Sequence, residues 1–275
     1  MNERSIAFLG GGRMGEALVA GLLRAGARTT DEVLVTCRRE ERAQELTERH
    51  GVATTLDNAE ACRFAGVLVL MAKPQDFEVL LRQIADHVTT DHLVVTFAAG
   101  IRTSFVEQHL AHDVPIVRVM SNVPVMVDEA MSVIAPGRYA DDKHLAVAEE
   151  LLASVGRVLR LEERYLDAVT ATSGSGPAYF FLLAEAMIEA CILLGLSRDV
   201  ASQLIIQTML GSAKMLRDTG THPVELREMV TSPGGTTIEA IRHLEEAGVR
   251  AAFLNAIDAA KRRSEELARG GDEDD

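Results

Sequence analysis

Two glycine-rich segments carry the groups best suited to binding small anions. The first, Gly10–Gly15, follows a short apolar run and opens an Ala- and Leu-rich stretch of helical character. In that context Gly10 permits the tight turn, Gly12 lets the backbone approach a pyrophosphate, and Gly15 lets the helix pack on the strand. The pattern predicts a dinucleotide site, with a ligand-free glycine turn as the alternative. The expected cofactor residues in this segment are Gly10, Gly12, Arg13, Met14 and Gly15.

The second segment, Thr231–Thr237, has the sequence Thr-Ser-Pro-Gly-Gly-Thr-Thr and opens directly onto another helical stretch. Unpaired N–H groups and the positive end of a helix dipole favour an anion such as a carboxylate. A helix-capping turn without a ligand is the alternative. The expected donors are the backbone N–H groups of Gly234, Gly235 and Thr236 and the hydroxyls of Ser232 and Thr237.

The end of the second apolar run, Thr36-Cys37-Arg38-Arg39, predicts which dinucleotide binds. An NAD site usually places Asp or Glu there for the ribose hydroxyls. The guanidinium groups of Arg38 and Arg39 suit a ribose 2′-phosphate instead, through charged hydrogen bonds. NADPH is therefore the expected cofactor, with NADH as the second choice. The alternative is that both arginines merely begin a solvated helix.

Three further segments end strand-like runs on the expected cofactor side of the sheet. Pro74 fixes the turn after one run, and Lys73 either meets the cofactor or only covers the strand end. Small side chains at Ala98 and Ala99 leave room for a flat ring. Asn122 either orients a carboxamide or caps a turn. The expected cofactor contacts here are Lys73, Pro74, Ala98, Ala99 and Asn122.

Apolar runs of strand length, separated by helical patterns, form the framework that positions these segments. Strands are expected at 5–9, 32–36, 67–72, 93–97, 116–120, 130–135 and 157–161. Such runs predict a parallel, doubly wound α/β sheet. Beyond about residue 166 only helical patterns remain, at 177–194, 198–216, 223–230 and 236–268. We therefore predict a Rossmann-type dinucleotide-binding domain at 1–163, an all-α substrate-binding and dimerisation domain at 164–270, and an acidic tail at 271–275.

Composition narrows the classes of partner. The net charge of −13, without a basic block, disfavours nucleic acid and anionic membranes. Three widely spaced cysteines suggest neither disulfides nor zinc, and no metal site is expected. No apolar run is judged long enough to span a membrane and no signal peptide is evident, so a cytoplasmic location is expected. The Ala- and Leu-rich helices would expose much apolar surface, which favours an interleaved dimer over packing against the first domain.

The chain resembles pyrroline-5-carboxylate reductases along nearly its whole length. Beyond the two glycine-rich segments, the resemblance rests on Lys73-Pro74-Gln75, Ala98-Ala99-Gly100-Ile101, Ser173–Tyr179, Gln207–Lys214 and Val230–Ile238. It implies reduction of the cyclic imine of 1-pyrroline-5-carboxylate to L-proline by NAD(P)H, the last step of proline biosynthesis. It also implies that the carboxylate binds the 231–237 loop and that Thr237 reaches the imine nitrogen. The family further implies an active site at a dimer interface, often within decamers.

The residues agree with that chemistry. These segments contain no evident strong acid, so the substrate is expected to enter as an iminium ion, with Thr237 positioning it and relaying a proton from water. A β-hydroxyacid dehydrogenase would need a Lys near the start of the helix after residue 177, and residues 178–188 contain none. A reductase of another small cyclic imine and a non-catalytic NADP-binding regulator remain the alternatives. The regulator would be expected to have a damaged 231–237 loop.

Overall fold

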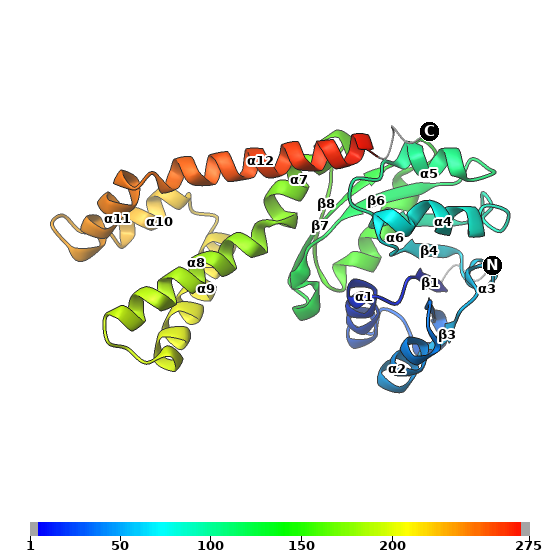
Figure 1. Ribbon diagram of the computed structural model, residues 1–275, viewed down its shortest axis with the longest axis horizontal. Helices are drawn as coiled ribbons and strands as arrows, with labels where there is room; N and C mark the ends of the chain where they lie inside the picture. Colours follow the sequence, from blue (N-terminus) through cyan, green and yellow to red (C-terminus); the bar gives the residue numbers. More distant parts are fainter. Residues whose placement is uncertain (1–4, 271–275) are drawn as a thin grey trace. The chain divides into compact units, whose positions relative to one another are not determined.

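Short strands, most of them rich in apolar residues, form one sheet in the first part of the chain (Figure 1). The computed structural model describes residues 5–270, with side chains described as far as residue 268. The sheet has eight strands in the order β3-β2-β1-β4-β5-β6-β7-β8. Their bounds are β1 Ile6–Leu9, β2 Val33–Thr36, β3 Ala53–Thr55, β4 Val67–Leu70, β5 Leu93–Thr96, β6 Ile116–Met120, β7 Ala130–Pro136 and β8 Gly156–Arg160. The predicted Rossmann-type fold is confirmed.

The last two strands run opposite to the other six, so the sheet is not wholly parallel as predicted. β7 pairs antiparallel with β6, and β8 pairs parallel with β7. Residues 121–129 connect β6 to β7 with only a short 3₁₀ turn, Val123–Val127. A parallel pair needs a crossover of about a dozen residues or more, so this connection forces an antiparallel one. Helix α6, Asp142–Ala153, is the crossover between β7 and β8.

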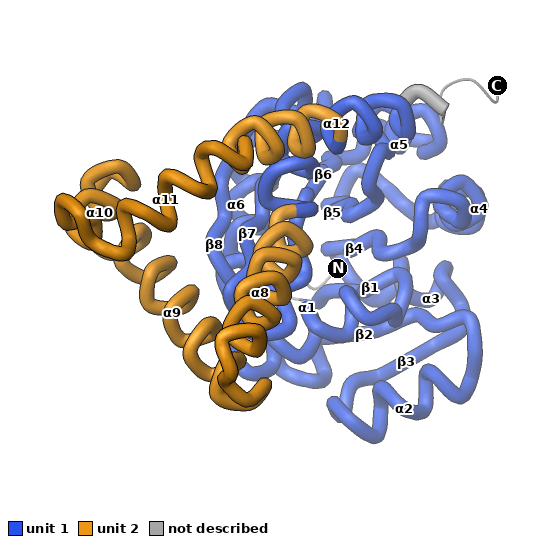
Figure 2. Tube along the Cα trace, turned by 60° about the vertical axis from the view of Figure 1, so that its left-hand side comes forward, with its two compact units in different colours: residues 1–175, 260–275 blue, residues 176–259 orange. Residues whose placement is uncertain are grey.

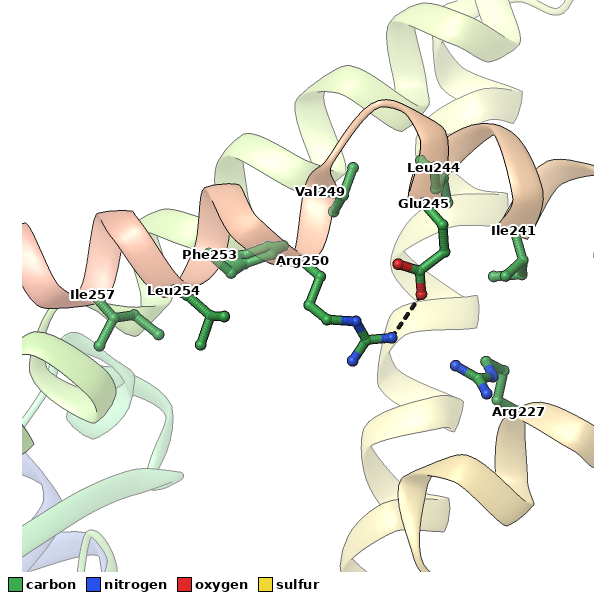
Figure 3. Close-up of a pocket in the computed structure, with 9 residues that line it drawn as sticks. All are labelled: Arg227, Ile241, Leu244, Glu245, Val249, Arg250, Phe253, Leu254 and Ile257. Carbon is green, nitrogen blue, oxygen red and sulfur yellow. Dashed lines mark hydrogen bonds and ion pairs between the residues drawn. The ribbon is translucent and has the colours of Figure 1, made fainter.

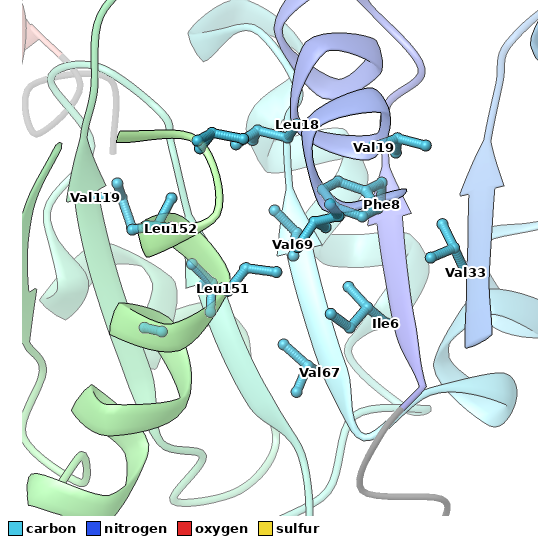
Figure 4. Packing of buried hydrophobic residues seen from close by; sticks show 14 of the residues in the cluster. Ile6, Phe8, Leu18, Val19, Val33, Val67, Val69, Val119, Leu151 and Leu152 are labelled. Carbon is cyan, nitrogen blue, oxygen red and sulfur yellow. The ribbon is translucent and has the colours of Figure 1, made fainter. Parts of the chain in front are cut away.

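Helices cover both faces of the sheet because both faces of its central strands are apolar. In β1, Ile6 and Phe8 pack into one cluster and Ala7 and Leu9 into another, and all four are buried. The first cluster, shown in Figure 4, includes residues of α1 and α6, and the second includes residues of α3, α4 and α5. The remaining helical bounds are α1 Arg13–Arg24, α2 Glu40–His50, α3 Asn58–Phe64, α4 Pro74–Ile84 and α5 Thr103–His109.

The second part of the chain is helical, as predicted, but its last predicted helix is divided into two. The bounds are α8 Gly176–Leu193, α9 Arg198–Thr219, α10 Pro223–Met229, α11 Thr236–Glu246 and α12 Val249–Gly270. The single helix predicted over 236–268 is wrong, because Gly248 has φ +73° and separates α11 from α12. A left-handed glycine of this kind commonly terminates a helix.

The segment just before α8, which contains Ser173-Gly174-Ser175, is itself helical. Helix α7, Leu166–Val169, continues into a π-helical turn at Thr170–Gly174. The hydroxyls of Thr170 and Thr172 donate to carbonyls four residues earlier, at 2.8 Å each, and so occupy polar groups that a loop would expose. Gly174 packs closely against Met120 of β6, since a Cβ there would lie 2.4 Å from the flexible Met120 Cε.

The chain forms two compact units, shown in Figure 2, whose border differs from the predicted one at 163/164. Among the described residues, 5–175 and 260–270 form unit 1, and 176–259 form unit 2. The end of α12 belongs with unit 1, where Ser264 Oγ donates to Asp167 Oδ1 at 2.7 Å. The predicted acidic tail, 271–275, lies outside the described residues.

One helical stretch, Glu163–Leu193, is long and apolar enough to cross a membrane by length and composition alone. The expectation that no run has that length is therefore wrong. Only 6% of its most apolar 18-residue window is buried within the chain. The described residues of this chain therefore leave most of that window unpacked.

Candidate active site

A cleft of about 980 Å³ lies at the carboxyl ends of β1, β2 and β4 in unit 1. The strand order reverses direction at β1 and β4, which is where ligands bind in open α/β sheets. Six of the residues predicted to bind the cofactor line this cleft: Gly10, Gly12, Arg13, Arg38, Arg39 and Lys73. The structure therefore brings together the glycine turn, the two arginines and the lysine, which are far apart in sequence.

The glycine turn is shaped by close contacts that a side chain would prevent. Gly10 has φ +124°, and a Cβ there would lie 3.1 Å from the Met71 carbonyl carbon. A Cβ at Gly15 would lie 2.7 Å from the Gly10 carbonyl oxygen, so α1 packs directly on the turn. Gly12, by contrast, has open space around it and caps α1 with no side-chain cap among the described residues. The first N–H groups of α1 are therefore open to a phosphate group in the cleft.

A carboxylate in the first turn of α1 is neutralised by three basic side chains. Glu16 accepts hydrogen bonds from Arg42 at 2.6 Å and Arg49 at 2.5 Å, and its Oε1 lies 3.0 Å from His50 Nε2. Partial burial acts to raise the pKa of Glu16, but these hydrogen bonds outweigh it and lower the pKa to about 2. Arg42 also donates to the Gly11 carbonyl at 2.8 Å, which ties α2 to the glycine turn. Glu16 stays ionised, and the positive charges of Arg42 and Arg49 balance a carboxylate that would otherwise repel a pyrophosphate.

Replacing Glu16 by Gln is expected to lower the free energy of unfolding near neutral pH and to flatten its dependence on acid. The pKa is about 2 in the folded chain against 4.5 ordinarily, so the ionised carboxylate stabilises the fold fully above pH 4.5. That contribution is lost as the pH falls toward 2. After allowance for solvent screening it amounts to about 1–2 kcal/mol. Urea unfolding from about pH 7 to pH 3 should show the difference between wild type and variant shrinking; a constant difference would contradict this origin.

The part of the cleft after the end of β2 carries two arginines, Arg38 and Arg39, and both are exposed. Arg38 Nη1 lies 3.0 Å from Asp76 Oδ2, whereas Arg39 forms no ion pair within residues 5–268. Cys37 lies between the arginines and the glycine turn, and a Cβ at Gly11 would lie 2.7 Å from its Sγ. Burial raises the pKa of the Cys37 thiol, which keeps it neutral and makes it a packing group rather than a nucleophile.

The remaining predicted cofactor residues do not line the cleft of this chain. These are Met14, Gly15, Pro74, Ala98, Ala99 and Asn122. Gly15 and Pro74 shape elements that do, since Pro74 is the first residue of α4 and follows Lys73, its N-cap. Ala98 is buried in the core, and Ala99 is exposed.

Asn122 is buried and has both ends of its amide engaged by backbone groups. Its Nδ2 donates to the Ser173 carbonyl at 3.0 Å, and its Oδ1 accepts from the Met131 N–H at 2.9 Å. These contacts connect the end of β6 to the π-helical turn and to β7. Of the two roles left open by the sequence, this geometry favours the structural one.

The 231–237 loop lies in unit 2 and connects α10 to α11. Gly234 has φ +69°, and the Gly235 N–H donates to the Ser232 carbonyl at 3.1 Å. Gly235 caps α11 with no side-chain cap among the described residues, so the first N–H groups of the helix are available to a ligand. Thr237 is half-buried. In the described part of the chain, the Ser232 and Thr237 hydroxyls have no hydrogen-bond partner, whereas Thr231 Oγ1 donates to the Arg227 carbonyl at 2.6 Å.

Unit 2 also has a hollow of about 400 Å³, shown in Figure 3, that contains none of the predicted site residues. It is largely apolar, and its two guanidinium groups, Arg227 and Arg250, lie near Glu245, to which Arg250 donates at 2.6 Å. Its lining residues are Arg227, Ile241, Leu244, Glu245, Val249, Arg250, Phe253, Leu254 and Ile257. Such a lining suits apolar side chains better than a small carboxylate.

Comparison with known proteins identifies the family. The chain is 45% identical to a pyrroline-5-carboxylate reductase of Corynebacterium melassecola, over 96% of this chain and 99% of that protein. The chain belongs to the pyrroline-5-carboxylate reductase family. Residues 163–267 match the model of pyrroline-5-carboxylate reductase dimerisation, and residues 5–100 match a model described as NADP oxidoreductase, coenzyme F420-dependent. The predicted family and its oxidoreductase class are confirmed.

Solved structures agree with this family. A pyrroline-5-carboxylate reductase from Coxiella burnetii has a TM-score of 0.91 and 37% identity, covering 97% of this chain and 99% of that one. A Plasmodium falciparum pyrroline carboxylate reductase, solved with NADP bound, has a TM-score of 0.88 and 25% identity, covering 98% and 99%. The match to the dimerisation model covers residues 163–267, which include the exposed apolar helices of unit 2.

Proposed function

We propose that this chain reduces 1-pyrroline-5-carboxylate to L-proline with NADPH as the preferred hydride donor. The observation that carries the proposal is the intact 231–237 loop, with free N–H and hydroxyl donors, in a member of this reductase family. The cleft of unit 1 fits a dinucleotide, because Gly12 leaves open space at the first turn of α1 and Arg38 and Arg39 line the cleft after the end of β2. NADPH, when bound, supplies the hydride.

The chain's own residues would bind and orient the imine. The N–H groups of Gly234 and Thr236, with the Ser232 hydroxyl, would hold the carboxylate at the positive end of α11. The Gly235 N–H, expected as a third donor, closes the turn onto the Ser232 carbonyl instead, so Gly235 would contribute by shaping the loop. The Thr237 hydroxyl would contact the ring nitrogen. The substrate enters as an iminium ion, so the hydride adds to the ring carbon and the C=N π electrons pass to nitrogen as a lone pair. No strong acid is then required at the moment of transfer.

The cofactor side of the proposal uses the remaining cleft residues. Gly10, Gly12 and Arg13 would hold the pyrophosphate, and Arg38 and Arg39 the 2′-phosphate. Lys73 would lie along the cofactor, and Pro74 and Gly15 would act through the turns they shape. Met14, Ala98 and Ala99 do not line the cleft, and their proposed part rests only on their places in the first turn of α1 and shortly after β5. This set is proposed from the cleft and from the positions of the residues around it.

We further propose a homodimer in the cytoplasm, which can assemble into decamers, rather than a membrane protein. The apolar stretch 163–193 coincides with the start of the dimerisation match, so a second copy is the proposed cover for its exposed side chains. Light scattering of purified protein without detergent should give a dimer or a multiple of it. A stable monomer, or protein recovered only in detergent, would contradict this assembly.

The reaction is tested directly by mixing purified protein with 1-pyrroline-5-carboxylate and following NADPH oxidation. L-proline should form in a one-to-one ratio with NADP⁺, and NADH should support a lower kcat/KM. No turnover with either reduced cofactor would contradict the proposed reaction. Turnover of a different cyclic imine at a much higher kcat/KM would instead reassign the substrate.

A further inference from the structure

The ion pair between Arg38 and Asp76 spans the mouth of the cofactor cleft. Arg38 lies two residues after β2, and Asp76 lies in the first turn of α4, which follows β4. Because β2 and β4 flank β1, the pair joins the two sides of the sheet edge at which the glycine turn begins. Both residues line the cleft, with Arg38 Nη1 at 3.0 Å from Asp76 Oδ2.

Asp76 differs from the other carboxylates that line the cleft. Glu16 and Glu45 both pair with Arg42, at 2.6 and 3.1 Å, and Arg42 is an arginine not assigned to the cofactor phosphate. Asp76 instead occupies Arg38, one of the two guanidinium groups available to a ribose 2′-phosphate. The neighbouring Arg39 has no such partner among the described residues.

The pairing of Arg38 with Asp76 makes binding of the phosphorylated cofactor less favourable. A phosphate monoester carries about −1.5 to −2 charge near neutral pH, so it needs Arg38 and is repelled by the Asp76 carboxylate. A ribose 2′-hydroxyl is neutral, so it needs no counter-charge from Arg38 and is not repelled by the Asp76 carboxylate. The side chains are 80% and 38% exposed, so the pair is weak enough to break when a ligand arrives.

We propose that Asp76 sets the balance between NADPH and NADH by competing with the 2′-phosphate for Arg38. It thereby weakens NADPH binding without closing the site, and it leaves NADH binding almost unchanged. This inference rests on the proposed use of NADPH. It assigns Asp76 as a residue that determines specificity and takes no part in the hydride transfer itself.

The test measures Kd by calorimetry for NADP⁺ and NAD⁺, without substrate. Asp76→Asn should tighten NADP⁺ about five-fold and change NAD⁺ less than about two-fold. Glu78→Gln is the matched control, because it removes the same charge from α4 at a residue that does not line the cleft. In an Arg38→Gln background, Asp76→Asn should change the Kd of NADP⁺ by less than about two-fold. Thermal unfolding of both single variants without cofactor checks that the fold is retained.

Four results would overturn the inference. Asp76→Asn could weaken NADP⁺, change both dinucleotides equally, match Glu78→Gln, or keep its full effect when Arg38 is absent. A wild-type protein that binds neither dinucleotide would overturn the proposed function and this inference together. Binding of both, with an equal response to Asp76→Asn, would overturn the inference alone.

Discussion

Replacing Thr237 by Ala should lower kcat for 1-pyrroline-5-carboxylate about 100-fold and leave the Kd of NADPH within about two-fold. The Thr237 hydroxyl lies in the first turn of α11 and has no hydrogen-bond partner among the described residues. Its oxygen can therefore accept a hydrogen bond from the iminium N–H, and its hydroxyl can donate to the nitrogen lone pair that forms when the hydride adds. Losing a contact that orients the reacting group raises the barrier to transfer, whereas cofactor binding depends on the cleft of unit 1. Steady-state kinetics and a separate NADPH titration measure the two effects.

Two further variants separate a lost hydroxyl from a disturbed loop. Thr237→Ser keeps the hydroxyl and should recover most of the lost kcat. Ser202→Ala removes a hydroxyl elsewhere in unit 2, one that donates to the Arg198 carbonyl at 2.8 Å, and should leave kcat unchanged. Equal kcat for Thr237→Ala and wild type would remove Thr237 from the mechanism. Equal losses in Thr237→Ala and Thr237→Ser would indicate that packing, not hydrogen bonding, is responsible.

Much of the fold was predictable because local patterns and burial point to the same elements. Strand β1 is apolar at every position, which is expected only where helices cover both faces of a sheet. The glycine turn was predictable as well, since close contacts require Gly10 and Gly15, and Gly12 leaves the space that a pyrophosphate needs. The antiparallel β7 was missed because strand direction depends on the length of a connection, which apolar patterning does not record.

What could not be predicted depends on contacts between distant residues. Arg42 reaches both Gly11 and Glu16, and neither contact has a short-range signature. One local pattern did point to a charged network on α2, because Arg42, Glu45 and Arg49 share one face of that helix. The π-helical turn at Thr170–Gly174 has the Ser, Thr and Gly composition of a loop, and its hydroxyl-to-carbonyl bonds appear only once the helix is formed. Asn122 was ambiguous for the same reason, since its two backbone partners lie in other elements.

Replacing Arg38 and Arg39 together by Gln should raise the Kd of NADPH about 30- to 100-fold and change that of NADH by less than about two-fold. The two guanidinium groups line the cleft at the end of β2, and in the proposed complex they donate charged hydrogen bonds to the 2′-phosphate, which NADH lacks. Arg63→Gln with Arg82→Gln is the matched control, since it removes the same charge from unit 1 at residues that do not line the cleft. Similar losses for both cofactors would show that neither arginine recognises the phosphate.

The single variants should not be equal, and their difference tests the geometry of this end of the cleft. Arg39→Gln should weaken NADPH binding more than Arg38→Gln, because the gain from Arg38 is reduced by breaking its existing pair with Asp76. Raising the salt concentration should narrow the difference between them, since screening weakens the exposed ion pair. The reverse order, with Arg38→Gln the more damaging, would mean that Asp76 holds Arg38 ready for the phosphate instead of competing with it.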